Sequence, residues 1–231
     1  MSNIFTSSIG KKFWMALIGL FLCVFLVLHM SVNLLLLLSD RSYFDMGVHI
    51  MSSPPVKVME VVLFGSFALH ICLGLLLQIK NWLARGPERY AKKYSSENSF
   101  FSKYMIWTGG VIFIFLCLHF MHFYFIKLNL VSPPGSVEAE IFIADSETKI
   151  HNFYEIAHQL YKGSTAICLI YIGFMALLSF HLFHAFQSAF QSIGWNHPTY
   201  TPIIKWVGNI YAVLIPLGFA IIPLYFLFGG Q

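Results

Sequence analysis

Charged side chains are scarce in this chain of 231 residues. Asp, Glu, Lys and Arg make up 10% of it, far below the roughly 25% of a soluble globular domain. The mean hydropathy is +0.72. This composition excludes a soluble enzyme domain. We interpret the formal net charge of +4 as a sign of how the loops are distributed between the two sides of a membrane, and not as a sign of binding to nucleic acid. We therefore expect the chain to lie in a lipid bilayer.

Cysteine motifs are also lacking. The four cysteines fall in four different apolar segments, at Cys23, Cys72, Cys117 and Cys168, and no Cys-x-x-Cys or Cys-x-x-Cys-His occurs. Iron–sulfur, zinc and covalent c-type haem sites therefore lack their ligands. No flavin or dinucleotide motif is present either. We interpret the cysteines as residues of helix packing.

Long apolar runs are what the chain does have. Five segments contain no Asp, Glu, Lys or Arg: residues 13–38, 61–79, 104–126, 163–190 and 206–228. Each reaches or approaches the roughly 20 apolar residues that a spanning helix needs. The first run is too long for a signal peptide and lacks a small-residue cleavage site, so we expect it to be retained. These segments predict an all-α membrane bundle of five transmembrane helices, with residues 1–231 as one domain.

The distribution of basic residues predicts the orientation. With the N-terminus in the cytoplasm, the inner segments carry nine Lys and Arg against two acids, and the outer segments carry five against eight acids. Inner loops are enriched in Lys and Arg, so we expect a cytoplasmic N-terminus.

Three connections have distinct characters. Residues 81–103 form a basic inner loop suited to an acidic partner protein. Residues 150–161 predict a short interfacial helix with aromatic anchors. Residues 40–60, which contain Pro54 and Pro55, are expected to dip into the outer interface.

Four histidines lie inside four of the predicted spans: His29, His70, His119 and His184. Ionisable residues are rare in spans and usually mark a functional site. Neutral imidazole is also well suited to hold a haem iron inside a helix bundle. Four such residues on four helices are the number that two bis-histidine haems require.

The depths of these histidines predict their pairing. At about 1.5 Å per residue, His29 and His119 lie about 24 and 22 Å from the inner ends of their spans. His70 and His184 lie about 14 and 9 Å from theirs. Depth therefore pairs His29 with His119 in the outer half and His70 with His184 in the inner half. It leaves open two competitors three residues away, His122 and His181. A lone histidine in a span is often a packing or proton-relay residue, which is the alternative for each.

Four stretches carry a resemblance to a known family: residues 19–30, residues 70–74 with Lys80-Asn81 and Ala84-Arg85, Thr108-Gly109 with His119 ten residues later, and residues 181–194. In this pattern the chain resembles the cytochrome b membrane-anchor subunit of succinate dehydrogenases and fumarate reductases, in its form with five spans and two haems. The resemblance implies His29 and His119 as ligands of the distal haem b and His70 and His184 as ligands of the proximal one. It favours His119 over His122, and His184 over His181.

The resemblance also implies partners and a task. A flavoprotein subunit with FAD would hold the succinate site, an iron–sulfur subunit would relay electrons, and this chain would exchange them with a membrane quinone, menaquinone in preference to ubiquinone. The expected location is the bacterial cytoplasmic membrane, as a multi-pass protein. One departure is visible, because Leu182 stands where some dihaem fumarate reductases have a glutamate associated with proton movement.

Quinone chemistry needs an ionisable group near the outer haem, because two protons move with two electrons. Asp40, Asp45, His49 and Glu60 are candidates by position on the outer loop after the first span; the alternative for each is an ordinary interfacial residue. Two other functions stay open for the whole chain. One is a dihaem cytochrome b of another quinone-linked oxidoreductase, and the other is a haem-free proton-coupled transporter.

Overall fold

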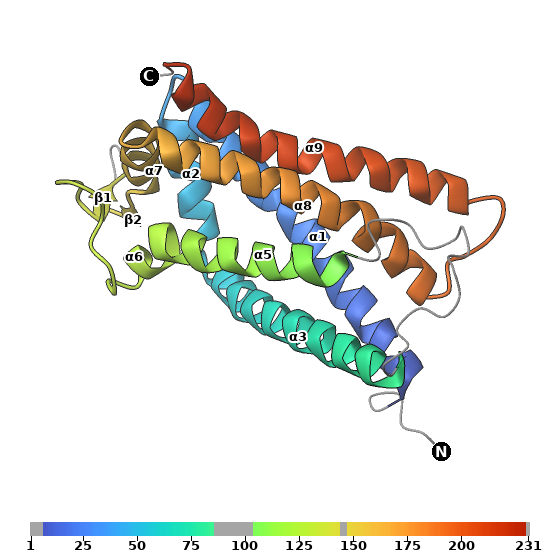
Figure 1. Ribbon diagram of the computed structural model, residues 1–231. Helices are drawn as coiled ribbons and strands as arrows, with labels where there is room; N and C mark the ends of the chain where they lie inside the picture. The colour runs from blue at the N-terminus through green and yellow to red at the C-terminus, as the bar shows by residue number, and fades with distance from the viewer. Residues whose placement is uncertain (1–6, 86–103, 144–146, 230–231) are drawn as a thin grey trace.

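The computed structural model describes residues 7–85, 104–143 and 147–229. Five long helical segments run side by side (Figure 1). They are α1 (Ser8–Leu34), α3 (Pro54–Arg85), α5 (Met105–His119), α8 (Thr165–Ser192) and α9 (Thr201–Leu227). Each lies in a segment long and apolar enough to cross a membrane. The predicted all-α membrane bundle of five spans is thereby confirmed.

Two of these segments continue in another helical form. A short 3₁₀ helix, η1 (Leu35–Leu37), follows α1, while a π-helix, η2 (Phe120–Tyr124), and α6 (Phe125–Lys127) follow α5. The start of α1 and the end of α9 lie at opposite ends of the bundle (Figure 1), as an odd number of spans requires.

The helix α3 is longer than predicted, because it starts at Pro54 and so includes Lys57 and Glu60. The sequence prediction placed Glu60 on a loop, which is wrong. Proline suits the first helical turn, where its missing N–H has no intrahelical partner to lose. Long charged side chains near a helix end also reach the membrane surface while their stems stay on the helix.

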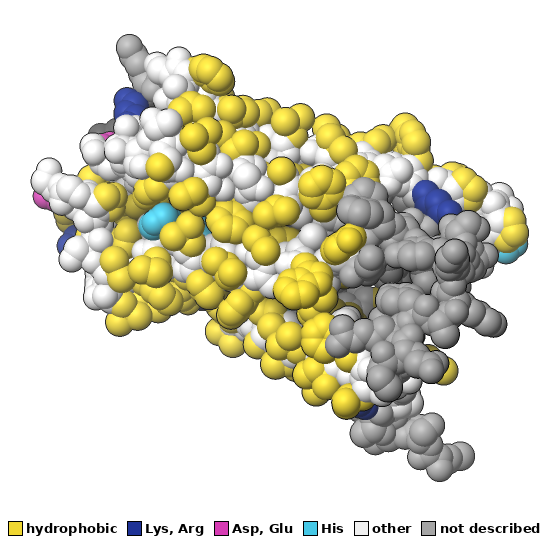
Figure 2. Space-filling model, viewed as in Figure 1, with side chains coloured by type: hydrophobic (Ala, Val, Ile, Leu, Met, Phe, Trp, Pro, Cys, Tyr) yellow, Lys and Arg dark blue, Asp and Glu magenta, His cyan; other side chains and the backbone are white. Residues whose placement is uncertain are grey.

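Apolar side chains cover the outside of the bundle, as expected of a surface that faces lipid. In Figure 2 they occupy the middle of the visible face, and the visible Lys, Arg, Asp and Glu side chains lie towards its two ends. Val61, Leu83 and Trp107 are among the most exposed, at 73%, 78% and 68%. Exposure of this extent on spanning helices excludes a water-facing bundle.

Close helix packing concentrates on α8 and α9, while α1 packs on α3, α8 and α9, and α5 packs on α8. Small residues permit this approach: a Cβ at Gly208 would lie only 2.8 Å from Phe186 Cδ1. The Ser179 hydroxyl donates to Ala212 O at 2.6 Å, and Tyr211 donates to Cys23 O at 2.7 Å. Such hydrogen bonds between helices and small residues at contacts are typical of membrane bundles.

The interpretation of the cysteines as packing residues holds for two of them. Cys23 and Cys168 are buried, whereas Cys72 and Cys117 are exposed on their helices, and all four are free thiols.

One end of the bundle is covered by a small cap made of α2 (Ser42–Met51), β1 (Glu140–Phe142), β2 (Lys149–His151) and α7 (Phe153–Lys162). We call this the capped end (Figure 1, left). The two strands are antiparallel, with Ile141 opposite Ile150. The helix predicted at residues 150–161 is present as α7, but its first residues pair into β2. The interfacial segment predicted at residues 40–60 contains α2 and the start of α3.

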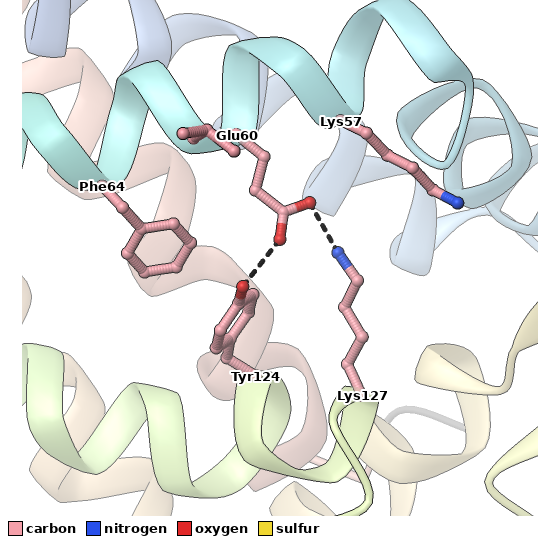
Figure 3. Close-up of a pocket in the computed structure, with 6 residues that line it drawn as sticks. Lys57, Glu60, Phe64, Tyr124 and Lys127 are labelled. Atoms are coloured by element: carbon pink, nitrogen blue, oxygen red, sulfur yellow. Dashed lines mark hydrogen bonds and ion pairs between the residues drawn. The ribbon is translucent and has the colours of Figure 1, made fainter.

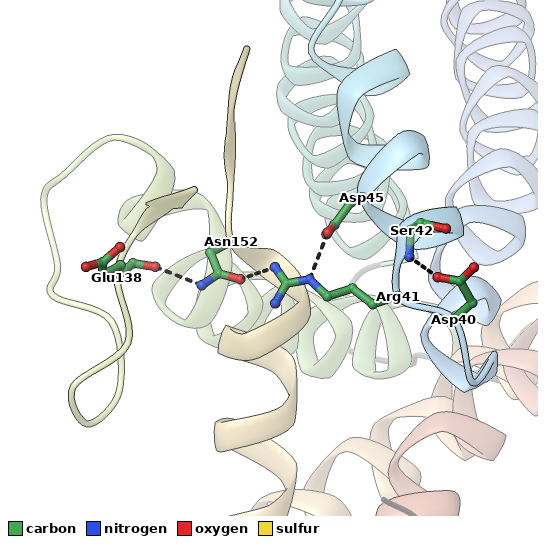
Figure 4. Close-up of polar contacts among 6 residues, drawn as sticks. All are labelled: Asp40, Arg41, Ser42, Asp45, Glu138 and Asn152. Atoms are coloured by element: carbon green, nitrogen blue, oxygen red, sulfur yellow. Dashed lines mark hydrogen bonds and ion pairs between the residues drawn. The ribbon is translucent and has the colours of Figure 1, made fainter. Parts of the chain in front are cut away.

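Arg41 joins two parts of the cap (Figure 4). Its Nε donates to Asp45 Oδ2 at 2.7 Å, and its Nη2 donates to Asn152 Oδ1 at 2.7 Å. Asn152 in turn donates to Glu138 O at 3.1 Å, and the guanidinium lies 5.0 Å from the Tyr154 ring centroid. The residue before α2 is therefore fastened to the start of α7. Charge-assisted bonds of this kind are stronger than neutral ones.

Candidate functional site

Two of the predicted histidines meet inside the bundle. The rings of His29 on α1 and His119 on α5 have centroids 5.8 Å apart and planes at 84°. Phenylalanine rings surround the pair: Phe25 and Phe219 beside His29, Phe115 and Phe123 beside His119, at 5.1–5.9 Å between centroids. The structure thus brings together the two residues that helix depth pairs. Their role as haem ligands stays a prediction.

The geometry of this pair fits a bis-histidine haem. Metal–imidazole bonds of about 2 Å place two rings on one metal with centroids about 6 Å apart, close to the spacing observed. His119 Nδ1 is buried without a hydrogen-bond partner. His29 Nδ1 lies 3.3 Å from Asn33 Nδ2, and Asn33 also donates to His29 O at 2.8 Å. The Asn33 contact orients the His29 ring, as outer partners of metal-binding histidines do.

The competitor His122 is turned to another partner. Its Nδ1 lies 2.8 Å from the Tyr171 hydroxyl, and the two rings stack with centroids 5.9 Å apart. His122 lies in the π-helix η2, whose wider turn changes the direction of side chains relative to a regular α-helix. The geometry therefore favours His119 over His122 as the partner of His29.

The predicted inner pair is arranged differently. Among the described residues, no ring contact joins His70 on α3 to His184 on α8. His70 Nδ1 is buried without a partner, and a Cβ at Gly19 would lie 3.7 Å from its ring. Glycine at this position leaves space beside His70 that a side chain would fill.

The competitor His181 is better held than His184. Its Nδ1 lies 3.2 Å from the Thr108 hydroxyl, and a Cβ at Gly109 would lie 3.5 Å from its Cε1. A hydrogen bond at Nδ1 leaves Nε2 free, an arrangement common among metal-binding histidines. The geometry of the helices therefore does not favour His184 over His181, and the inner ligand on α8 stays a prediction on the resemblance alone.

Of the quinone candidates, Glu60 lies in a pocket. The pocket has a volume of about 280 Å³ and is lined by Lys57, Glu60, Val61, Phe64, Tyr124 and Lys127 (Figure 3). Tyr124 donates to Glu60 Oε1 at 2.8 Å, and Lys127 Nζ donates to Glu60 Oε2 at 2.7 Å. The Phe64 ring lies 4.7 Å from that of Tyr124. An apolar wall and three hydrogen-bonded polar groups thus meet in this pocket.

A short aromatic connection links this pocket to the His29–His119 pair. Phe120 lies between them: its centroid is 6.5 Å from that of His119, 5.7 Å from that of Tyr124 and 5.4 Å from that of Phe64. The pocket therefore lies one to two helical turns from His119, because Tyr124 and Lys127 follow that histidine by five and eight residues.

The other three quinone candidates lie in the cap and do not line this pocket. Asp45 is ion-paired with Arg41, and His49 is exposed on α2. Asp40 accepts from Ser42 N at 2.8 Å, and hydrogen bonding to Ser42 lowers the pKa of Asp40. Asp45 Oδ1 is buried without a hydrogen-bond partner, and a quinone-site role for these three residues stays a prediction.

The sequence analysis missed Tyr124 and Lys127. In the sequence, Lys127 is the first charged residue after the third apolar segment, and nothing distinguishes Tyr124 from the other tyrosines among the 11 in the chain. Their spacing of three residues on one helix face was the available signal, but their meeting with Glu60 depends on how α3 and α6 approach each other.

No group of three or more His, Cys, Asp or Glu side chains able to hold a metal ion occurs in residues 7–85, 104–143 and 147–229. A haem iron takes two axial side chains at most, so the pair is the relevant unit for this chain. Most of the basic loop at residues 81–103, the expected docking segment, lies outside the described residues. Comparisons with protein-family models, with curated proteins and with solved structures found no match to this chain.

Proposed function

We propose that this chain is the membrane-anchor cytochrome b subunit of a succinate:quinone oxidoreductase and holds two b haems. The observation that carries the proposal is the His29–His119 pair, with ring centroids 5.8 Å apart inside a five-span bundle. The resemblance of the four histidine-containing stretches to that family supplies the physiological context. Haem b, when bound, supplies one-electron redox chemistry.

The residues of this chain would hold and orient the groups that react. His29 and His119 would fix one haem, with Asn33 setting the orientation of the His29 ring. His70, with His184 or His181, would fix the second. The phenylalanines around His29 and His119 would exclude water from the first site.

The Glu60 pocket is the proposed quinone site. Quinone reduction consumes two protons and two electrons, and quinol oxidation releases them. Glu60 is the carboxylate placed to accept or return a proton there, held by Tyr124 and Lys127 at 2.8 and 2.7 Å. Phe64 would stack on the quinone ring, because aromatic rings attract one another when they pack face to face with an offset or edge to face.

The partners follow from the same proposal. A flavoprotein subunit would interconvert succinate and fumarate. An iron–sulfur subunit would dock at the end opposite the cap, where α3 ends at Arg85. With positive residues inside, that end faces the cytoplasm of a bacterium and the quinone pocket lies towards the outer surface.

The test is the number of b haems per polypeptide in the purified complex, with a reduced-minus-oxidised spectrum recorded after succinate is added. Two haems, at least one of them reduced by succinate, are expected. Two haems that succinate does not reduce would assign the chain to another quinone-linked oxidoreductase. A complex without haem would overturn the proposal and favour a proton-coupled transporter.

A further inference from the structure

A second pocket lies at the capped end, beside the Glu60 pocket. Its volume is about 270 Å³, and it is lined by Ser52, Lys57, Lys127, Leu128, Glu140, Lys149, Ile150 and His151. We call it the lysine pocket, because three of its lining residues are lysines from three separate parts of the chain: α3, α6 and β2. It shares Lys57 and Lys127 with the Glu60 pocket.

The lysine pocket contains most of the positive charge at the capped end. The segments at the capped end contain only five Lys and Arg residues: Arg41, Lys57, Lys127, Lys149 and Lys162. Three of the five line this one pocket. Like charges placed together in a low-dielectric boundary region cost free energy unless an anion binds between them.

Two of the three lysines form no ion pair among the described residues, although Lys57 interacts electrostatically with Glu60. Lys127 is ion-paired with Glu60 at 2.7 Å. Neither Lys57 nor Lys149 forms an ion pair within the described ranges, and Lys149 Nζ lies 5.2 Å from the Phe142 ring centroid. Glu140, the acid that lines the pocket, has an oxygen 3.9 Å from His151 Nδ1. Burial lowers the pKa of His151, so its ring is neutral at pH 7 and offers a further hydrogen bond without charge.

Exposed apolar side chains lie close in sequence to residues that line the lysine pocket. Val58 and Val61 lie on the neighbouring turns of α3, Leu128 and Leu130 follow α6, and Phe142 lies on β1; all five are exposed. Exposed apolar side chains do not contribute to the binding of a soluble anion. They can contact the acyl chains of a lipid whose charged headgroup binds in the pocket.

We propose that the lysine pocket binds the phosphate headgroup of an anionic phospholipid, with Lys57 and Lys149 as the principal cationic contacts. The acyl chains would run from the pocket along the exposed face of α3 at Val58 and Val61. The volume of about 270 Å³ is near the lower bound of roughly 300 Å³ for small-molecule sites, so it accommodates a headgroup and not a whole lipid. Lys side chains at a membrane surface attract the anionic headgroups of lipids. The proposal uses neither histidine pair and does not depend on the proposed function.

The experiment measures lipid binding to the purified full-length chain, with any subunits that copurify. Delipidated protein in detergent is titrated with phosphatidylglycerol and, separately, with phosphatidylcholine of the same acyl chains, and bound lipid is counted by native mass spectrometry. We expect wild type to prefer phosphatidylglycerol, and the Lys57→Gln/Lys149→Gln variant to lose about fivefold in affinity for each lysine removed. Lys162→Gln, which removes a lysine of the capped end outside the pocket, is the matched control and should keep the preference.

Several results would overturn the proposal. Equal binding of the two lipids by wild type would do so, and so would an unchanged preference in the double variant with a helical circular dichroism spectrum like that of wild type. Lys149→Gln alone, in the small hairpin of the cap, is the second variant should the double one fail to fold, and it too must weaken phosphatidylglycerol binding. If inorganic phosphate binds the delipidated wild type in a manner that depends on Lys57 and Lys149, and phosphatidylglycerol does not displace it, the pocket binds free phosphate and the lipid assignment is wrong.

Discussion

His29 on α1 and His119 on α5 face each other with ring centroids 5.8 Å apart and planes at 84°. The pair lies among phenylalanines, and the buried Nδ1 of His119 has no partner. A buried polar group without a hydrogen bond costs free energy, and histidine is seldom kept in a span without a function. We expect these two histidines to hold one haem.

Replacing His119 by Ala is expected to lower the haem content from two to one per polypeptide, because one axial ligand of the outer haem is lost. His29→Ala should give the same result, since the two rings share one site. The measurement is haem b per polypeptide from the absorbance of the purified complex. The matched control is His122→Gln, three residues further along the chain, which should keep both haems. Loss of haem from His122→Gln with full retention in His119→Ala would reverse the assignment of this pair.

Replacing Glu60 by Gln is expected to slow quinone-linked turnover by about 10²-fold or more, because a positioned acid–base group contributes roughly 10²–10⁴-fold. Haem content and reduction of haem by succinate should stay near the wild-type level. Glu155→Gln, an acid of α7 outside the pocket, should leave turnover unchanged. Normal quinone reduction by the Glu60→Gln complex would contradict the placement of the quinone site.

Replacing Gly208 by Ala is expected to destabilise the α8–α9 contact. The added Cβ would lie 2.8 Å from Phe186 Cδ1, and the Phe186 ring is held between Phe190 and Tyr211. Overpacking costs about 1–3 kcal/mol, only partly offset by a gain of up to about 1 kcal/mol in helix propensity. Gly65→Ala on α3, with nothing within 4 Å of its Cβ, should be neutral or stabilising. Thermal unfolding in detergent compares the two, and equal melting temperatures would show that Phe186 moves at no cost.

Replacing Arg41 by Ala is expected to loosen the cap, because Asn152 is 5% exposed and would lose its charged donor. Leaving such a group without a partner costs about 1–3 kcal/mol. The measurement is hydrogen exchange of the backbone amides in α2 and α7, which should accelerate in the variant while those of α8 and α9 stay protected. Lys162→Ala is the control, since Lys162 is exposed at the end of α7. Unchanged exchange in both cap helices would show that the Arg41 contacts are not stabilising.

Stability is expected to fall on acidification because of His158 in α7. Burial, with smaller effects from Lys162 and Arg41, lowers the pKa of His158, and its Nε2 is buried without a partner. In the unfolded chain the pKa returns to about 6.5, so the unfolded state binds more protons as the pH falls through that value. The stabilisation by neutral His158 is therefore complete above about pH 6.5 and is lost below it.

The variant that tests this effect is His158→Phe, which retains a ring between Tyr154 and Phe226 and cannot take up a proton. Melting temperatures from pH 8 to pH 5 should decline less steeply for it than for wild type. Identical slopes for wild type and His158→Phe would exclude His158 as a source of acid sensitivity.

The amino-acid sequence by itself determined that this is an all-α membrane bundle with five spans, because apolar length and the absence of charge are properties of each segment alone. The sequence also predicted that His29 and His119 lie at the same depth and form a pair, since depth in a bilayer follows from position along a straight helix. It did not separate His119 from His122 on physical grounds, because both lie near one helix face and only the π-helix turns His122 to Tyr171.

Only the tertiary structure decided which side chains from different helices meet. Glu60 joins Tyr124 and Lys127 because α3 extends beyond its apolar core to Pro54 and contacts η2 and α6 at the capped end. His181 forms a hydrogen bond with Thr108 because α5 packs against α8. Rotation and tilt of one helix against another are set by side-chain packing across the contact, such as Gly208 against Phe186, and no periodicity within a single segment contains that information.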